Sequence, residues 1–244
     1  MPKIPDSPEE IFEEFARDFQ NVFGTDLISI ILYGSGAKGE YVPKKSDINF
    51  LIILSENGIE NLDRVLDLIP KWRKRNVAVP LFLTEAYIES ALDTFPIEFL
   101  NMKNYYKLVF GEDVLKDLEI DKEDLRLQIE RELRGKLIYL REGFLSTGQD
   151  RERLKEMLSA SVPAITSMFE ALLYLKEEPV PHSKVQVFAR TAELYGLPNS
   201  IFVQLINIKK GEWKGSKIQL QDMTKAYISE IKKLVEIVDK MYLV

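Results

Sequence analysis

Two short polar motifs lie close together in the first fifth of the sequence. The first, Gly34-Ser35-x-x-x-Gly39, directly follows an apolar segment, and the second, Ser46-Asp47-x-Asn49, directly precedes another. Glycines let a backbone approach a phosphate closely, and the amides of a turn and of a following helix N-terminus donate hydrogen bonds to an anion. Because Ser35 adds a hydroxyl, we predict a phosphate-binding turn at the first motif.

The second motif supplies two oxygen-bearing side chains. Asp47 opens a strand that we predict at Asp47–Leu54, and Asn49 lies on the same face because successive strand side chains alternate. Magnesium prefers hard oxygen ligands and usually shares its shell with substrate phosphates. Asp47 and Asn49 beside a phosphate-binding turn therefore make up half of a magnesium site.

The apolar segments around these motifs predict a sheet. Leu27–Leu32 is a buried strand, rich in β-branched residues, that leads into the first motif. Val77–Leu83 predicts a third strand, and Pro80, which lacks the N–H needed for a ladder, places it at an edge or a bulge. Further predicted elements are a helix starting at Ser7-Pro8 with a capping box closed by Glu10, a turn at Asn57-Gly58, a helix around Leu62–Ile69, and strands at Pro96–Leu100 and Tyr105–Phe110.

The sequence changes character near Asp117. Beyond that point apolar residues recur at helical spacing, as in the run Ile129, Leu133, Leu137 and Leu140. We therefore divide the chain into two domains. Residues 1–117 are predicted to form an α+β domain with a mixed sheet flanked by helices, and residues 118–244 an all-α helical bundle.

The overall composition excludes several classes of protein. The chain has 244 residues, of which 30% are charged, a net charge of −6 and no cysteine, which excludes disulfides and zinc–thiolate sites. Its single histidine, His182, argues against a histidine-based metal site. The acidic balance disfavours nucleic acid as a partner, and the longest apolar runs fall short of the roughly 20 residues that span a bilayer. We expect a soluble cytoplasmic protein that does not bind a membrane.

Taken together, the two motifs resemble the signature of the nucleotidyltransferase superfamily, the polymerase-β-like group that includes the kanamycin nucleotidyltransferase type. In that signature a strand leads to Gly-Ser and a loop, and the next strand carries Asp-x-Asp or Asp-x-Glu. Leu32–Gly39 and Ser46–Ile52 match it. The resemblance covers about Ile28–Gly111, and the second half of the chain is similar to the accessory helical bundle of such proteins. It implies a nucleotidyltransferase-type α+β domain followed by a helical bundle.

The resemblance also implies a nucleotide site with bound metal. Active members hold a nucleoside triphosphate between two divalent metals on three carboxylates and transfer a nucleotidyl group to a hydroxyl. Carried over to this sequence, Gly34 and Ser35 grip the phosphates, and Asp47 is the first metal ligand, with Asn49 beside it. Further nucleotide contacts are expected from Lys38, Gly39 and Ser46. One or two Mg²⁺ ions are implied, with ATP as the expected nucleotide.

The sequence departs from the signature in two places. Asn49, which is neutral, stands where the second carboxylate is expected. The third is expected on the strand Val77–Leu83, where the sequence has Val79-Pro80-Leu81 instead. The candidate sources of a third carboxylate are Glu85, Asp93 and Glu98, or none.

Three functions remain open at this stage. The first is an enzyme that transfers AMP from a magnesium-bound triphosphate to a hydroxyl of a small molecule or protein. The second is a catalytically impaired nucleotide-binding or regulatory module that retains the fold. The third is a structural or partner-binding protein that acts through its helical bundle, for instance as a homodimer.

Overall fold

The computed structural model describes residues 3–147 and 150–241. The chain forms two compact units, which we call the α/β unit (Met1–Asp93 and Glu98–Ile120) and the helical unit (Thr94–Ile97 and Asp121–Val244). The main division therefore lies between Ile120 and Asp121, whereas the sequence placed it after Asp117. The short segment Thr94–Ile97 belongs to the helical unit although it precedes that division.

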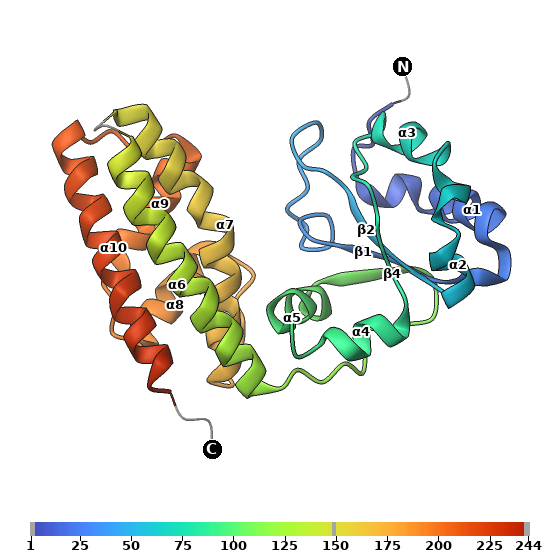
Figure 1. Ribbon diagram of the computed structural model, residues 1–244. Helices are drawn as coiled ribbons and strands as arrows, with labels where there is room; N and C mark the ends of the chain where they lie inside the picture. The colour runs from blue at the N-terminus through green and yellow to red at the C-terminus, as the bar shows by residue number, and fades with distance from the viewer. Residues whose placement is uncertain (1–2, 148–149, 242–244) are drawn as a thin grey trace. The chain divides into compact units, whose positions relative to one another are not determined.

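A four-stranded sheet in the order β3-β2-β1-β4 forms the centre of the α/β unit (Figure 1). β1 (Leu27–Tyr33) pairs antiparallel with both β2 (Asn49–Leu54) and β4 (Tyr106–Gly111), whereas β3 (Leu81–Leu83) runs parallel to β2. This arrangement confirms the mixed sheet. Successive residues of β1 and β2 point to opposite faces of the sheet, and most of them are buried. Both faces of the sheet are therefore covered by other parts of the chain.

Two strands are shorter than predicted. Asp47 lies before β2, because Ile48 forms only an isolated bridge with Val77. β3 begins at Leu81, directly after Pro80, which cannot donate to a ladder. β3 does lie at an edge of the sheet, as Pro80 indicated. Asp47 therefore belongs to the loop that enters β2 and not to the strand itself.

The segments between the strands are helical more often than predicted. Asn57-Gly58, predicted as a turn, lies inside α2 (Glu56–Glu60), where Ser55 caps the helix by accepting the Gly58 N–H. Pro96–Leu100, predicted as a strand, is the start of α5 (Pro96–Asn104), because proline suits a first helical turn. The remaining helices before Ile120 are η1 (Pro8–Ile11), α1 (Phe12–Phe23), η2 (Gly24–Asp26), η3 (Leu62–Val65), α3 (Leu68–Arg73) and α4 (Glu85–Ala91).

The first helix starts differently from the predicted capping box. Ser7 makes no side-chain cap, and the carboxylate of Glu10 accepts the N–H of Asp6 at 3.3 Å. The first turn, Pro8–Ile11, is a 3₁₀ helix, which places the backbone groups differently from an α-helical turn. The predicted position of the helix is right, but the predicted cap is wrong.

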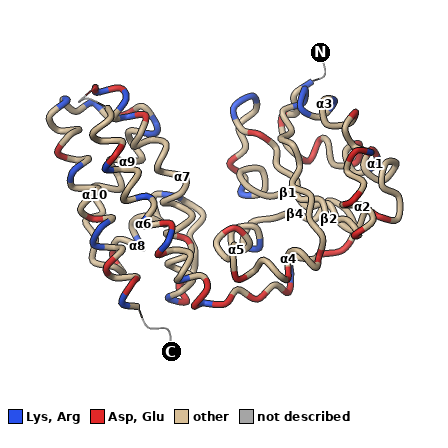
Figure 2. The backbone as a smooth tube through the Cα atoms, viewed as in Figure 1, with Lys and Arg blue, Asp and Glu red and all other residues tan. Residues whose placement is uncertain are grey.

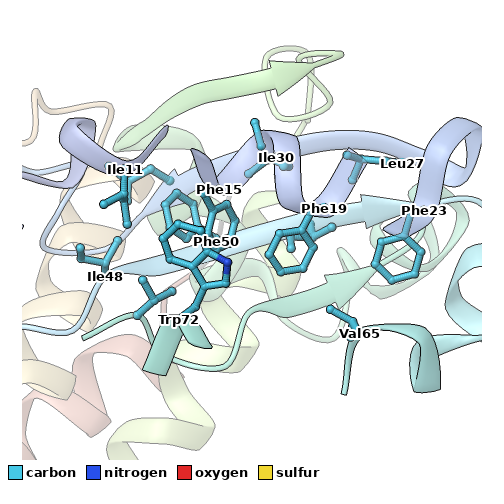
Figure 3. Packing of buried hydrophobic residues seen from close by; sticks show 14 of the residues in the cluster. Ile11, Phe15, Phe19, Phe23, Leu27, Ile30, Ile48, Phe50, Val65 and Trp72 are labelled. Atoms are coloured by element: carbon cyan, nitrogen blue, oxygen red, sulfur yellow. The ribbon is translucent and has the colours of Figure 1, made fainter. Parts of the chain in front are cut away.

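An aromatic core joins α1 to one face of the sheet (Figure 3). Phe15 is fully buried and stacks on Phe50 of β2, with ring centroids 4.0 Å apart, and it meets Trp72 of α3 edge-on at 4.9 Å. Trp72 is only 1% exposed and its indole N–H donates to Asp18 at 3.1 Å. The Trp72 ring is therefore part of the core and is not available to stack on a nucleic-acid base.

The helical unit consists of long helices with strong N-terminal caps. The aspartates before the first two, Asp121 and Asp150, each accept two backbone N–H groups of the turn that follows, and Ser216 closes a full capping box with Gln219. Its helices are α6 (Lys122–Ser146), α7 (Arg151–Leu175), α8 (Lys184–Leu194), α9 (Asn199–Lys210) and α10 (Lys217–Asp239).

α7 is the central helix of this unit. It runs unbroken through Pro163. The hydroxyl of Thr166 donates to the carbonyl of Val162, and that of Ser161 donates to the carbonyl of Leu158, both within the helix. By length and composition alone α7 could cross a membrane, but 67% of its apolar window is buried inside the unit, as in the core helix of a globular bundle.

Candidate functional site

The Gly34-Ser35 motif forms a turn that is held by its own backbone. Gly34 and Gly39 take positive φ angles of 72° and 75°, which residues with a Cβ rarely adopt. Lys38 donates its N–H to the Gly34 carbonyl at 3.0 Å, and Glu40 donates to Ser35 at 2.9 Å. These bonds fix the shape of the turn before any ligand arrives.

A loop, and not a helix, follows this turn. Residues 34–48, all of which the structure describes, contain only turns and irregular backbone before β2. The reason is that β2 returns antiparallel to β1, so a loop can join them. Within the described chain, the backbone N–H groups of Ser35, Gly36 and Ala37 form no hydrogen bond. Gly36 is buried, but Ser35 and Ala37 are only half-buried, so the turn still offers donors to an anion.

Three segments meet at the end of the sheet where β1 finishes. Tyr33, the last residue of β1, pairs in register with Asn49 of β2 and with Tyr106 of β4. The Lys38 ammonium lies 4.3 Å from the centroid of the Tyr105 ring, within cation–π distance. We call this region, formed by residues 33–39, 46–49 and 105–106, the motif end of the sheet.

The two tyrosines paired at the motif end are neutral at physiological pH. Burial raises the pKa of the Tyr33 hydroxyl. Burial, together with a 2.9 Å hydrogen bond to Asp113, raises the pKa of Tyr106 to about 12. Neither phenol therefore adds negative charge that would repel a phosphate.

Asp47 is positioned by a residue that the sequence did not point to. Asn76 donates its side-chain amide to the Ser46 carbonyl at 2.7 Å, and its own carbonyl accepts the Ile48 N–H at 2.9 Å. Asn76 takes a left-handed φ of 66°, a conformation in which asparagine is common after a helix. These two bonds clamp the backbone on both sides of Asp47, whose side chain is exposed. The signal that the sequence offered was an asparagine three residues after Arg73, the last residue of α3.

Ser46 has a structural role in the same loop. Its hydroxyl oxygen accepts the N–H of Val42 at 3.1 Å, while its O–H hydrogen remains able to donate. The neighbouring Tyr41 hydroxyl donates to the Pro5 carbonyl at 3.1 Å and so ties the loop to the N-terminal segment. Burial, and then the carboxylates of Asp6, Glu10 and Asp47, raise the pKa of Tyr41.

Asn49 packs directly against the turn. A Cβ placed on Gly34 would lie 3.3 Å from the Asn49 Nδ2 atom, so the amide group occupies the space that Gly34 leaves free. Nδ2 also donates to the backbone carbonyl of Asp47 over a long 3.4 Å contact. The structure thus brings the two predicted motifs into contact, and the part of Asn49 that faces the turn is a hydrogen-bond donor.

The neighbouring strand position is apolar. Extending the pairing of Leu51 with Leu81 back by two residues places Val79 beside Asn49, and the Ile48–Val77 bridge places Ala78 there. Neither residue has a polar side chain, and Val79 is 58% exposed. The third carboxylate of the signature would occupy this position.

The alternative carboxylates lie in later segments of the chain. Glu85 lies past the far end of β3, and because β2 and β3 are parallel it is about 20 Å from Asn49 along the sheet, at about 3.3 Å per residue. Asp93 follows α4, and Glu98 lies within α5. Among residues 3–147 and 150–241, no three histidine or acidic side chains gather closely enough to hold a metal ion.

The residues present therefore do not fit a two-metal centre. Asp47 supplies one exposed carboxylate, Asn49 turns an amide nitrogen toward the turn, and Val79 is apolar. Magnesium in proteins is usually held by one or two carboxylates together with substrate phosphates and waters, so a pair of metals needs more carboxylates than Asp47 alone supplies. What the motif end can do is offer hydrogen-bond donors and lysine charge to an anion.

A search of solved structures finds a similar fold in the crystal structure of spectinomycin adenyltransferase AAD(9) from Enterococcus faecialis with ATP and spectinomycin. The match has a TM-score of 0.56 and covers 93% of this chain and 99% of that chain, at 13% sequence identity. No protein-family model and no curated protein sequence matches the chain. At this identity the comparison shows the fold alone, and this fold, an α+β unit with a mixed sheet followed by helices, is the one that the sequence predicted.

Proposed function

We propose that this chain, which has a nucleotidyltransferase fold, binds a nucleoside triphosphate at the motif end of its sheet and works as a binding or regulatory module without two-metal transfer. The observation that carries the proposal is the Asn49 amide packed against Gly34. The turn at Gly34 offers backbone donors, while the position that needs a second carboxylate holds a donor. ATP is the first candidate, and a cytoplasmic location belongs to the same proposal.

Each predicted contact has a defined part in this binding mode. Gly34 and Gly39 set the shape of the turn through their positive φ angles, and Ser35 adds a hydroxyl to the free backbone N–H groups. Lys38 brings a positive charge, and the Ser46 O–H is able to donate. Charge-assisted hydrogen bonds of this kind are the stronger ones that proteins make with phosphate.

Thermal unfolding with ATP, GTP, CTP and UTP tests the binding. A ligand at 100 times its Kd should stabilise the folded chain by about 2.7 kcal/mol. We expect Lys38→Ala to weaken binding roughly tenfold, since it removes one charge-assisted contact. Lys225→Ala, which removes the same charge from an exposed position of α10, is the matched control and should leave the shift unchanged. Absence of a shift with every nucleotide would contradict the proposal and favour a partner-binding role of the helical unit, including a homodimer.

Nucleotidyl transfer is the alternative, and the similarity to an adenyltransferase solved with ATP and spectinomycin favours it. In that case AMP would pass from ATP to a hydroxyl of a small molecule or protein. Magnesium would have to rely on the Asp47 carboxylate and the Asn49 amide oxygen among the residues of the motif end.

Pyrophosphate release separates the two functions. We expect none above background from ATP and magnesium with spectinomycin as a trial acceptor, under conditions in which the thermal shift demonstrates binding. Release that disappears in Asp47→Ala would establish transfer and contradict the module. Because Asp47 is exposed, this variant is expected to fold.

A further inference from the structure

Asn49, which stands in place of a metal-binding carboxylate, also changes how the site can interact with a phosphate. We propose that the motif end binds the phosphates of its nucleotide directly, without a divalent cation. The inference rests on the proposed nucleotide binding and concerns how the negative charge of the ligand is met.

Asn49 is the central residue of the argument. A primary amide nitrogen carries two N–H groups, and the contact with the Asp47 carbonyl uses one of them. Nδ2 lies against Gly34, at the start of the turn whose N–H groups at Ser35, Gly36 and Ala37 are free within the described chain. An anion seated on that turn therefore meets a further donor. A carboxylate in the same place only accepts hydrogen bonds and would repel a phosphate unless a cation lay between them.

The charge of the surrounding segment agrees with direct binding. Residues 34–49 contain three lysines and two acidic residues, a net charge of +1 in a chain whose net charge is −6. Lys44 and Lys45 are exposed on the loop between β1 and β2, where Figure 2 shows basic residues. An aspartate at position 49 would remove this excess. Lysines and amides thus stabilise the negative charge of the phosphates directly. In a site lined by carboxylates, a bridging cation would have to do so.

The apolar neighbour of Asn49 points the same way. Val79 is 58% exposed beside the start of β2 and has no oxygen to offer a metal. The amide nitrogen of Asn49, and not its oxygen, faces the Asp47 carbonyl. A cation at this position would find a single carboxylate, that of Asp47, whereas a phosphate oxygen there meets donors.

Binding of inorganic tripolyphosphate and of ATP, each by titration calorimetry in magnesium and in excess EDTA, tests the inference on the wild-type chain. We expect the Kd values in magnesium and EDTA to agree within about threefold. Asn49→Asp should weaken binding in EDTA roughly tenfold or more, because it replaces a donor by a like charge, and magnesium should restore part of the loss. Asn199→Asp makes the same change at an exposed position of α9 and should have no effect.

The outcomes distinguish this inference from the function beneath it. Wild-type binding that requires magnesium and vanishes in EDTA would overturn direct binding but leave the nucleotide site intact. Equal affinities of Asn49→Asp and wild type in EDTA would also overturn it, once the melting temperature without ligand shows that the variant is folded. No binding of either probe in either condition would contradict the proposed function itself.

Discussion

The two units of this chain are stabilised by different kinds of contact. In the α/β unit, β1 pairs with β4, and the partners Ser29 and Gly111 are far apart in the sequence. In the helical unit, caps such as Asp121 and ion pairs such as Glu130–Arg134 join residues within one or two turns. The comparison teaches that the α/β unit depends on backbone geometry where distant segments pair, whereas the helical unit also uses contacts that are local to each helix.

Glycines show the contrast most directly. Gly111 takes a φ of 78°, and a Cβ there would lie 1.9 Å from the Ile28 carbonyl oxygen of the neighbouring strand. Gly135, in the middle of α6, has nothing within 4 Å of the same ideal Cβ. Gly143 on the same helix is different, because its Cβ would lie 2.4 Å from the Met157 sulfur of α7. One glycine is required by strand geometry, one by helix crossing, and one by neither.

The largest expected effect comes from the aromatic core. Phe15→Ala should lower the free energy of unfolding by about 3–5 kcal/mol, because it leaves a cavity between Phe50 and Trp72. Urea denaturation followed by fluorescence measures the change. Phe169→Ala, which removes the ring between Phe188 and Phe202 in the helical unit, should cost a similar amount. A loss below about 1 kcal/mol for Phe15→Ala would show that this core is loosely packed.

The second largest effect is expected from a substitution that disturbs the backbone geometry of the α/β unit. Gly111→Ala should destabilise the chain by roughly 3 kcal/mol, since the new methyl group meets a backbone carbonyl and the positive φ is strained. Urea denaturation again provides the measurement. Gly39→Ala is the control, because it has a similar φ of 75° and nothing within 4 Å, and it should cost only about 1–2 kcal/mol. Equal costs at the two positions would mean that the carbonyl contact is unimportant.

A smaller and opposite effect is expected in the helical unit. Gly135→Ala should stabilise the chain by about 0.5–1 kcal/mol, because alanine favours the helix and the site is open. Gly143→Ala on the same helix should not share this gain, since Met157 must move to accommodate it. Melting temperatures of the two variants test the prediction. A gain in both would argue against tight packing of α6 on α7.

The smallest effect concerns pH. A hydrogen bond from Arg134, and then one from Arg126, hold the pKa of Glu130 below its ordinary value of 4.5. A carboxyl whose folded-state pKa is depressed contributes stability above its unfolded pKa, and this contribution is lost as the pH falls through the folded value. Glu130→Gln should therefore flatten the decline of the unfolding free energy below about pH 4.5. The exposed Glu132 on the same helix provides the control variant, Glu132→Gln. If the two variants showed the same dependence of the unfolding free energy on pH, the low pKa of Glu130 would not be the cause.

Much of the fold could be predicted because its signals are local. The apolar run of β1 and the helical spacing of α6 and α10 record which face of each element is buried, and the two motifs stand beside strands that the structure contains. The strand expected at Pro96–Leu100 was wrong, because a short apolar segment does not by itself distinguish a strand from a helix.

The sequence by itself determined the mixed sheet followed by helices and the meeting of Gly34 with the Asp47–Asn49 motif. Only the tertiary structure decided how side chains from distant segments combine. Pairing of β2 with β3 and with the segment before it placed an apolar residue, Val79 or Ala78, beside Asn49 and carried Glu85 to the other end of the sheet. The physical reason is that local spacing fixes which way a side chain points along its own element, whereas strand pairing fixes what stands next to it.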